Sequence, residues 1–118
     1  MPEHIEKGKK SEEIAAEYLS DHGYEILDTN FRYKKKEIDI ICKKDNYLVI
    51  VEVKTKSFWS EENPGDLVKL GKQRFLIAAA EAYIIKNNID MEVRFDIIFI
   101  VYKNEEIIIE HIEDAYGP

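Results

Sequence analysis

The chain has 118 residues, of which 45% are hydrophobic and 35% charged, and this size and balance predict one folded domain over residues 1–118 rather than a disordered chain. A single cysteine, Cys42, excludes a disulfide within the monomer and a zinc site built from cysteines. No apolar run reaches the roughly 20 residues of a membrane helix, and the polar first residues do not resemble a secretory signal. We therefore expect a cytoplasmic protein with no membrane partner.

The charge is distributed unevenly along the chain. A formal net charge of −7 by itself argues against a nucleic-acid-binding protein, because such proteins carry basic surfaces. Residues 32–74, however, hold 11 basic and 7 acidic side chains, a net charge of +4. Residues 1–31 hold 3 basic and 8 acidic side chains, and residues 75–118 hold 3 basic and 9 acidic. The middle of the chain is the part suited to an anionic partner, unless its lysines are merely solvated.

Seven elements are predicted in the order α-β-β-β-α-β-β, which makes the fold class α/β with a mixed central sheet flanked by helices. They are a helix at 5–22, strands at 24–33, 37–42 and 47–56, a helix at 67–87, and strands at 91–102 and 106–111. The turns between the first three strands are the lysine run 34–36 and residues 43–46.

The first helix carries an acid in its apolar stripe. Ala15 and Leu19 recur at helical spacing, and Gly23 follows where a left-handed cap belongs. Glu12 lies three and seven residues before these two apolar positions, so its carboxylate faces the sheet. A carboxylate on a buried face needs a cation or a metal as partner, although Glu12 also has the option of pairing with a basic side chain at the edge of the core.

The strand at 47–56 is apolar on both faces in its middle, which is typical of a central strand. Glu52 and Lys54 then share one face at its far end, where a strand emerging into water would equally place them. In the preceding strand Glu37 and Asp39 share a face, with Ile38 and Ile40 on the other. The hairpin between the strands sets Asp39 against the region of Val49 to Glu52, so that two like charges would face each other. A divalent cation held by oxygen ligands would remove that cost.

The remaining polar residues receive structural interpretations. Asp66 is predicted to cap the second helix, and Phe58 and Trp59 either pack or stack a nucleobase. Arg94 and Asp96 share a strand face, which favours a structural ion pair. Cys42 is interpreted as a small strand residue. The three histidines are predicted to have no catalytic role: His4, His22 and His111.

The set Glu12, Asp39 and Glu52-x-Lys54 resembles the PD-(D/E)xK nuclease superfamily, whose core is the restriction-endonuclease-like fold. The chain is more closely similar to the YraN family of small bacterial proteins, which is related to archaeal Holliday-junction resolvases. The stretches that carry this resemblance span nearly the whole chain: Gly8-x-x-x-Glu12-x-x-Ala15, Tyr18-Leu19, Gly23-Tyr24-x-Ile26-Leu27, Asn30-Phe31-Arg32, Glu37-Ile38-Asp39-Ile40-Ile41, Val51-Glu52-Val53-Lys54-Thr55-Lys56, Lys72-Gln73 and Arg94-Phe95-Asp96. Ile38 replaces the superfamily's Pro, and Lys36 stands where the family usually has Gly.

The resemblance implies a metal-dependent nuclease that hydrolyses phosphodiester bonds in DNA, including branched or junction DNA. It implies that Asp39, Glu52 and the Val53 carbonyl hold Mg²⁺ or Mn²⁺, that Glu12 binds the metal directly or through water, and that Lys54 acts on the attacking water and the phosphate. Glu37 is a further candidate. The residues expected to contact nucleic acid are Lys56, Lys69, Lys72 and Arg74.

Two alternatives remain at this point. One is a non-catalytic module that keeps the nuclease fold and binds nucleic acid or protein, and the other is a purely structural interaction domain. We also leave open a homodimer as the assembly.

Overall fold

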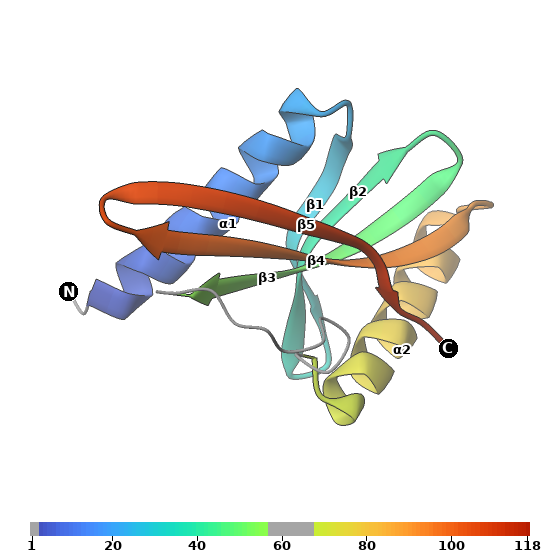
Figure 1. Cartoon of the computed structure of the whole chain (residues 1–118). Helices are drawn as coiled ribbons and strands as arrows, with labels where there is room; N and C mark the ends of the chain where they lie inside the picture. The colour runs from blue at the N-terminus through green and yellow to red at the C-terminus, as the bar shows by residue number, and fades with distance from the viewer. Residues whose placement is uncertain (1–2, 57–67) are drawn as a thin grey trace.

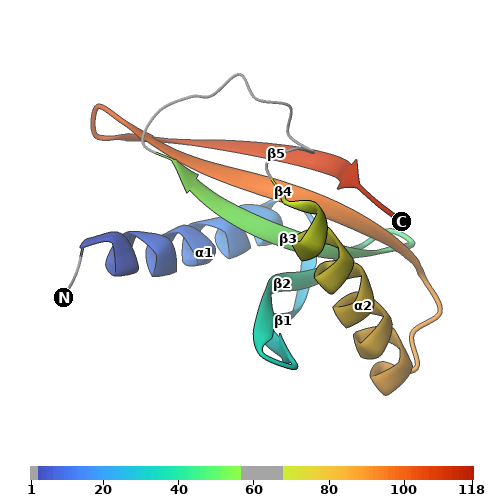
Figure 2. The ribbon, with the colours of Figure 1, turned by 90° about the horizontal axis from the view of Figure 1, so that it is seen from below.

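The computed structural model describes residues 3–56 and 68–118 of the chain, with side chains from residue 10 onward. In these residues it forms a five-stranded sheet with one helix on each face (Figure 1, Figure 2). The elements are α1 (Glu3–Asp21), β1 (Glu25–Tyr33), β2 (Lys36–Lys44), β3 (Tyr47–Lys56), α2 (Leu70–Asn87), β4 (Glu92–Lys103) and β5 (Glu106–Tyr116). The predicted order α-β-β-β-α-β-β and the mixed sheet are confirmed.

The strands follow one another across the sheet in the order β1-β2-β3-β4-β5. All neighbouring strands are antiparallel except β3 and β4, which are parallel and pair from Tyr47 with Glu92 to Lys56 with Val101. Since β3 is the middle strand, its apolar run is covered on both faces, as its sequence pattern predicts. The strand that carries the candidate acid and lysine is therefore held on both sides.

Alternation along β3 divides the interior into two cores. On one face, Val49 and Val51 pack with Leu19 of α1. On the other face, Leu48 and Ile50 pack with Leu76 of α2. Glu52 continues the series that begins with Leu48, so it lies on the α2 face of the sheet. No helix in the described residues is long and apolar enough to cross a membrane.

One prediction about β2 is wrong. Ile38 packs in the core on the α2 face, whereas Ile40 packs in the core on the α1 face, so the two isoleucines do not share a face. The alternation slips at Asp39, and Asn30 on the neighbouring strand has a positive φ of 51° beside it. The pairing of β2 with β3 also begins only at Ile40, which frees Asp39 from the regular ladder. The kink positions the Asp39 side chain.

The ends of several elements also differ from prediction. β2 continues to Lys44, and β5 continues to Tyr116 instead of ending at His111. The cap of α1 is as predicted, since Gly23 has φ of 87° and the N–H of Tyr24 donates to the carbonyl of Leu19. Asp66 lies outside the described residues, as do Phe58 and Trp59. The residue before α2 is Lys69, which makes no side-chain cap.

Candidate active site

The far end of β3 carries the first half of the site. Glu52 is only 6% exposed although it bears a carboxylate. Lys54 lies two residues further on the same face, and its Nζ is 4.0 Å from Oε1 of Glu52. The strand thus holds an acid in the interior and a partly exposed lysine beside it, where the sheet reaches solvent.

Asp39 of β2 brings a second carboxylate to this point. Its Oδ2 accepts a hydrogen bond of 2.8 Å from the backbone N–H of Val53, one residue beyond Glu52. The backbone pairing of the two strands ends at Ile40 and Val51, and the next hydrogen bond between them is made by the Asp39 side chain. This hydrogen bond holds the Asp39 carboxylate next to the part of β3 that carries Glu52. The antiparallel pairing that the sequence predicts for these strands is confirmed.

Glu12 reaches the same region from α1. Its carboxylate is half-buried, and its Oε2 accepts a hydrogen bond of 3.2 Å from Nδ2 of Asn30. A cavity of about 250 Å³ lies between α1 and the first two strands, and Glu12, Asn30 and Asp39 all line it. Asn30 is a site residue that the sequence analysis missed, since only the fold shows that its amide holds Glu12.

The three acids affect one another electrostatically. Burial, together with the nearby carboxylates of Glu52 and Glu12, raises the pKa of Asp39 from 3.8 to about 7 against the lowering effect of the Val53 N–H. Burial also raises the pKa of Glu52, although the ammonium groups of Lys72 and Lys54 oppose this. The structure therefore concentrates negative charge where it is poorly solvated, which is unfavourable for the metal-free protein.

This arrangement predicts an unusual pH dependence for the metal-free protein. The unfolded chain ionises Asp39 near pH 3.8, whereas the folded chain holds the proton until about pH 7. The folded state therefore binds more protons in this window, and Asp39 makes stability fall as pH rises from about 4 to above 7, by roughly 2–4 kcal/mol. Denaturant unfolding in EDTA at pH 5 and pH 8 measures the difference. The variant Asp39→Asn should flatten the dependence, and an equally steep dependence in that variant would assign it to other groups.

Lys72 is closer to the site than the sequence suggested. Its Nζ, carried by the first turn of α2, is 3.8 Å from Oε2 of Glu52. That oxygen is fully buried and has no hydrogen-bond partner among the described residues. Of the other lysines expected to contact nucleic acid, Lys56 lies over the Phe99 ring at 5.0 Å, while Lys69 is exposed at the start of α2. Arg74 is likewise exposed.

Two further acidic or polar groups need placing. Glu37, a candidate from its position near Asp39, is not brought to the site: its Oε1 is 3.9 Å from Nη1 of Arg32, and both side chains are exposed. Tyr116, at the end of β5, was not expected in this region. Its hydroxyl is buried without a partner among the described residues, and burial followed by the charge of Glu52 raises its pKa. Tyr116 is thus a second site residue that only the fold shows.

The donor set fits a hard divalent cation. Carboxylate oxygens are the ligands that Mg²⁺ prefers, and it commonly uses one or two of them with water. Asp39 and Glu52 supply two such groups on adjacent strands, and Oε2 of Glu52 accepts no hydrogen bond from the described residues, although Lys72 lies 3.8 Å away. A complete cluster of three acidic, histidine or cysteine ligands is not assembled within residues 3–56 and 68–118. Glu12 as a direct or water-mediated ligand and the Val53 carbonyl as a ligand remain predictions.

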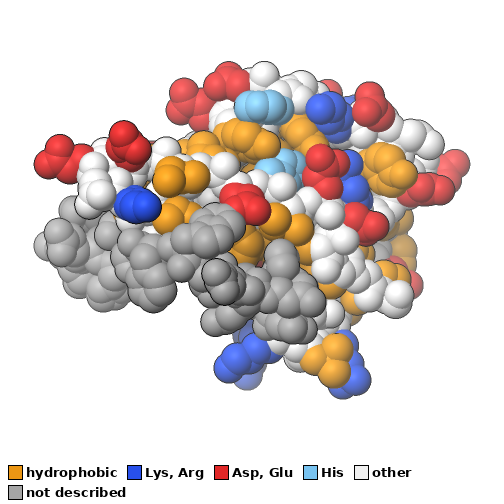
Figure 3. All heavy atoms as spheres, in the orientation of Figure 1, with side chains coloured by type: hydrophobic (Ala, Val, Ile, Leu, Met, Phe, Trp, Pro, Cys, Tyr) orange, Lys and Arg blue, Asp and Glu red, His pale blue; other side chains and the backbone are white. Residues whose placement is uncertain are grey.

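Part of the basic surface gathers at one end of the molecule. Figure 3 shows Lys and Arg side chains at the lower end, where the turn between β1 and β2 and the start of α2 lie, while the upper part of this face carries Asp and Glu with a few basic side chains among them. Not all of the basic middle of the sequence lies here, because Lys43 and Lys44 are at the other end of β2. An anionic partner would meet the lower end of the protein first.

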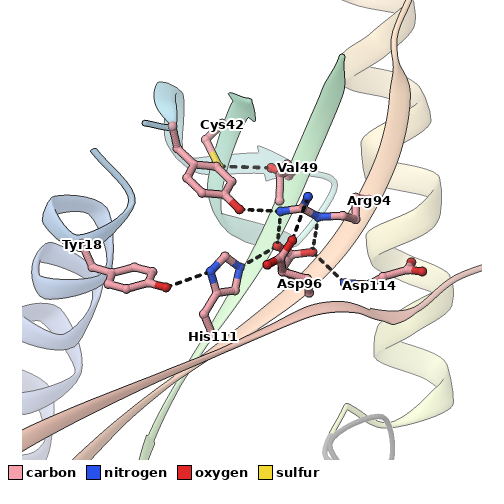
Figure 4. Close-up of polar contacts among 9 residues, drawn as sticks. Tyr18, Cys42, Val49, Arg94, Asp96, His111 and Asp114 are labelled. Atoms are coloured by element: carbon pink, nitrogen blue, oxygen red, sulfur yellow. Dashed lines mark hydrogen bonds and ion pairs between the residues drawn. The ribbon is translucent and has the colours of Figure 1, made fainter. Parts of the chain in front are cut away.

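A second polar cluster, centred on the fully buried Asp96, lies on the α1 face of the sheet, which is the face opposite to Glu52 (Figure 4). Arg94 donates to both carboxylate oxygens, from Nε at 3.0 Å and from Nη2 at 2.9 Å. Nε2 of His111 is 2.6 Å from Oδ2, and the N–H of Asp114 donates to Oδ1 at 3.0 Å. The predicted ion pair is confirmed. The two partners from β5 were missed, because only folding brings them to β4.

This cluster has the chemistry of a structural network. Burial acts to raise the pKa of Asp96, but His111, Arg94 and Asp114 outweigh it and keep the pKa below its usual value. The adjoining Tyr18 hydroxyl, 3.2 Å from Nδ1 of His111, has a raised pKa because it is buried. Ionisation of this tyrosine is therefore disfavoured, which leaves it poorly suited to act as a nucleophile. Cys42 is a buried strand residue, as predicted, and burial raises the pKa of its thiol to about 12.

Fold and site together define a class of α/β protein in which two adjacent strands of a mixed sheet present a half-buried acid, a buried acid and a lysine. The chain belongs to UPF0102, an uncharacterised protein family whose model matches residues 11–100. That span includes Glu12, Asp39, Glu52 and Lys54, and it confirms the resemblance to the YraN family.

Relatives match the chain over almost its whole length. It is 47% identical over 116 residues to a UPF0102 protein of Flavobacterium psychrophilum, with 98% of each chain covered. It is 48% identical over 116 residues to one of Christiangramia forsetii, with the same coverage. It is 46% identical over 118 residues to one of Phocaeicola vulgatus, with 100% of this chain and 98% of the relative covered.

Proposed function

We propose that the protein is a metal-dependent nuclease that hydrolyses phosphodiester bonds in DNA, including branched or junction DNA. The observation that carries the proposal is the Asp39–Glu52 pair: a half-buried and a buried carboxylate, both with raised pKa, on adjacent strands, with Lys54 beside them at the solvent edge. Two poorly solvated carboxylates close together lower the stability of the folded protein, and a function that needs a bound cation explains why they are present.

Each residue has a distinct role in the proposed mechanism. Asp39 and Glu52 would hold Mg²⁺ or Mn²⁺, with the Val53 carbonyl and Glu12 completing the ligands. When bound, the cation would supply a water of lowered pKa and neutralise charge on the phosphate. Lys54, 36% exposed at its side chain, would orient the attacking water and contact the phosphate from the solvent side. The Val53 N–H holds the Asp39 carboxylate in place at 2.8 Å.

The proposal is tested by a cleavage screen over linear, nicked, flapped and four-way DNA, in Mn²⁺ and in EDTA. Cleavage that requires Mn²⁺ and favours the branched substrates is the expected result. If titration calorimetry detects no Mn²⁺ binding and no DNA is cut, the alternative of a non-catalytic binding module replaces the nuclease. The contacts of Lys54 and Lys72 with Glu52 would then be permanent ion pairs.

The variant Lys54→Ala should separate chemistry from metal binding. The ammonium group is expected to act on water and phosphate, so its loss should lower the cleavage rate by about 100-fold. Mn²⁺ affinity measured by calorimetry should not weaken, because removing a cation 4.0 Å from Glu52 takes away a competitor for the carboxylate. A variant that loses metal affinity along with cleavage would assign Lys54 to the structure of the site instead.

A further inference from the structure

Three consecutive exposed lysines lie at the tip of the β1–β2 hairpin: Lys34 and Lys35 form the turn, and Lys36 begins β2. Among the described residues, none of them forms an ion pair with an acidic side chain. Glu37, the next residue, pairs with Arg32 instead. The charges of the turn are therefore not neutralised within the described part of the chain, and they remain available to an external anion.

Two aromatic rings connect this turn with the start of α2. The rings of Tyr33 and Phe75 lie with their centroids 5.9 Å apart. Nζ of Lys34 is 5.4 Å from the Tyr33 centroid, and Nζ of Lys36 is 5.8 Å from the Phe75 centroid. Nζ of Lys72 is also 5.8 Å from the Phe75 centroid. The ammonium groups of Lys36 and Lys72 thus lie no farther apart than twice this distance.

The same contacts connect the turn with the candidate site, because Lys72 is also 3.8 Å from Glu52. Basic groups therefore extend from the buried acids, across the Phe75 ring, to the tip of the β1–β2 hairpin. Each strand of a DNA duplex carries one phosphate per about 3.4 Å of helix axis, so groups spaced in this way meet phosphates of the same backbone segment.

The backbone of the turn adds a second observation. Lys34 has a positive φ of 58°, which costs energy for a residue with a long side chain. The first turn residues of the other two hairpins, Asp45 and Asn104, also have positive φ, and short polar side chains tolerate it better; Glu105, which follows Asn104, has a positive φ of 67° as well. An Asn at position 34 is therefore expected to fit the turn at least as well as the lysine.

We propose that the lysine run 34–36 at the tip of the β1–β2 hairpin, together with Lys72 on the Phe75 ring, forms a surface that binds the phosphate backbone of double-stranded DNA next to the cleavage site. This inference rests on the proposed function and adds to it the place where the substrate is held. Phosphate contacts of this kind position a duplex without reading its sequence, so the surface should bind unrelated sequences equally well.

The test compares two double variants that remove the same charge from opposite ends of one strand. Lys34→Asn with Lys35→Gln removes the turn lysines and relaxes the backbone. Lys43→Gln with Lys44→Gln removes two adjacent lysines at the other end of β2, about 25 Å away. Binding of a fluorescent duplex of about 20 base pairs is measured by anisotropy in EDTA, where no cleavage occurs. The salt concentration runs from about 50 to 200 mM.

The turn variant should bind the duplex about tenfold more weakly than the parent protein. Its plot of log affinity against log salt should be shallower by about 0.9 for each phosphate contact removed. The control variant should retain affinity close to the parent's. The melting temperature of the turn variant should equal or exceed the parent's, because Asn tolerates the positive φ at position 34 better than Lys does. If the variant is as stable as the parent, its lower affinity cannot be caused by unfolding.

Three results would overturn the inference. Equal losses of affinity in both variants would show that only the net charge of the protein matters. Unchanged affinity in the turn variant would place the DNA on another surface, but the nuclease proposal would stand if the parent protein cuts DNA. A parent that binds no duplex at about 50 mM salt would remove the surface, while the cleavage screen in Mn²⁺ would still decide the nuclease. If the parent binds the duplex and never cuts it, the nuclease proposal fails alone, and weaker binding by the turn variant still supports the surface.

Discussion

Replacing Glu52 with Gln, or Asp39 with Asn, should lower metal-dependent DNA cleavage by about 1000-fold or more and leave the fold intact. Each change keeps the size of the side chain and removes one negative charge that would hold the cation and so activate its water. The amide introduced by Asp39→Asn also keeps an oxygen that can accept the N–H of Val53. Because the folded state disfavours ionisation of both acids, each variant should melt at a higher temperature than the parent in EDTA.

The matched control is Glu37→Gln, which removes the same charge from an exposed position two residues before Asp39. It should leave cleavage and melting temperature near the parent values, since an exposed pair such as Arg32 with Glu37 contributes little. Cleavage and thermal unfolding are measured for each protein with Mn²⁺ and with EDTA. Undiminished cleavage by Asp39→Asn would place the chemistry at another site, and a large fall in its melting temperature in EDTA would make Asp39 a structural acid.

Replacing Asp96 with Ala should destabilise the protein by about 3–5 kcal/mol, the range measured when one partner of a buried ion pair is removed. The change leaves Arg94, with a side chain only 14% exposed, without its bidentate partner. It also leaves His111 and the N–H of Asp114 without the carboxylate to which both are hydrogen-bonded. Urea unfolding measures the loss.

The control for this prediction is Glu113→Ala. Glu113 pairs with Arg94 at 3.1 Å but is 61% exposed, so its removal should cost less than about 1 kcal/mol. Similar losses in both variants would show that the buried contacts of Asp96 add nothing to the exposed pair. The stabilisation by Asp96 should also be present at neutral pH and disappear as the pH falls below about 4, because its pKa is lowered in the folded state.

The architecture and the central acids were predictable because they depend on local patterns. The apolar run of β3 indicates a strand covered on both faces, and the short turn before it indicates a hairpin with β2. Those two inferences suffice to bring Asp39 next to Glu52, within the register error of one or two residues. Alternation along the strand then places Lys54 on the same face as Glu52.

The remaining site residues were not predictable, because their contacts join distant parts of the chain. Asn30 holds Glu12 from another element, and Lys72 reaches Glu52 across the sheet–helix interface. Tyr116 comes near Glu52 only because β5 extends beyond its apolar segment. A regular two-residue alternation also hides the slip at Asp39, since nothing in the isoleucines around it signals that they enter different cores.

The single parallel pairing in the sheet determines the order in which the protein is completed. Two-residue turns join β1, β2 and β3, so these strands pair as soon as they leave the ribosome, whereas β3 waits for β4, which follows α2 in the chain. All three acids of the candidate site belong to the part that is made first. Their repulsion therefore acts on a half-built sheet whose apolar central strand still has one open edge. We expect docking of β4 onto that edge to be the slowest step of folding, because it is the pairing that closes the longest loop.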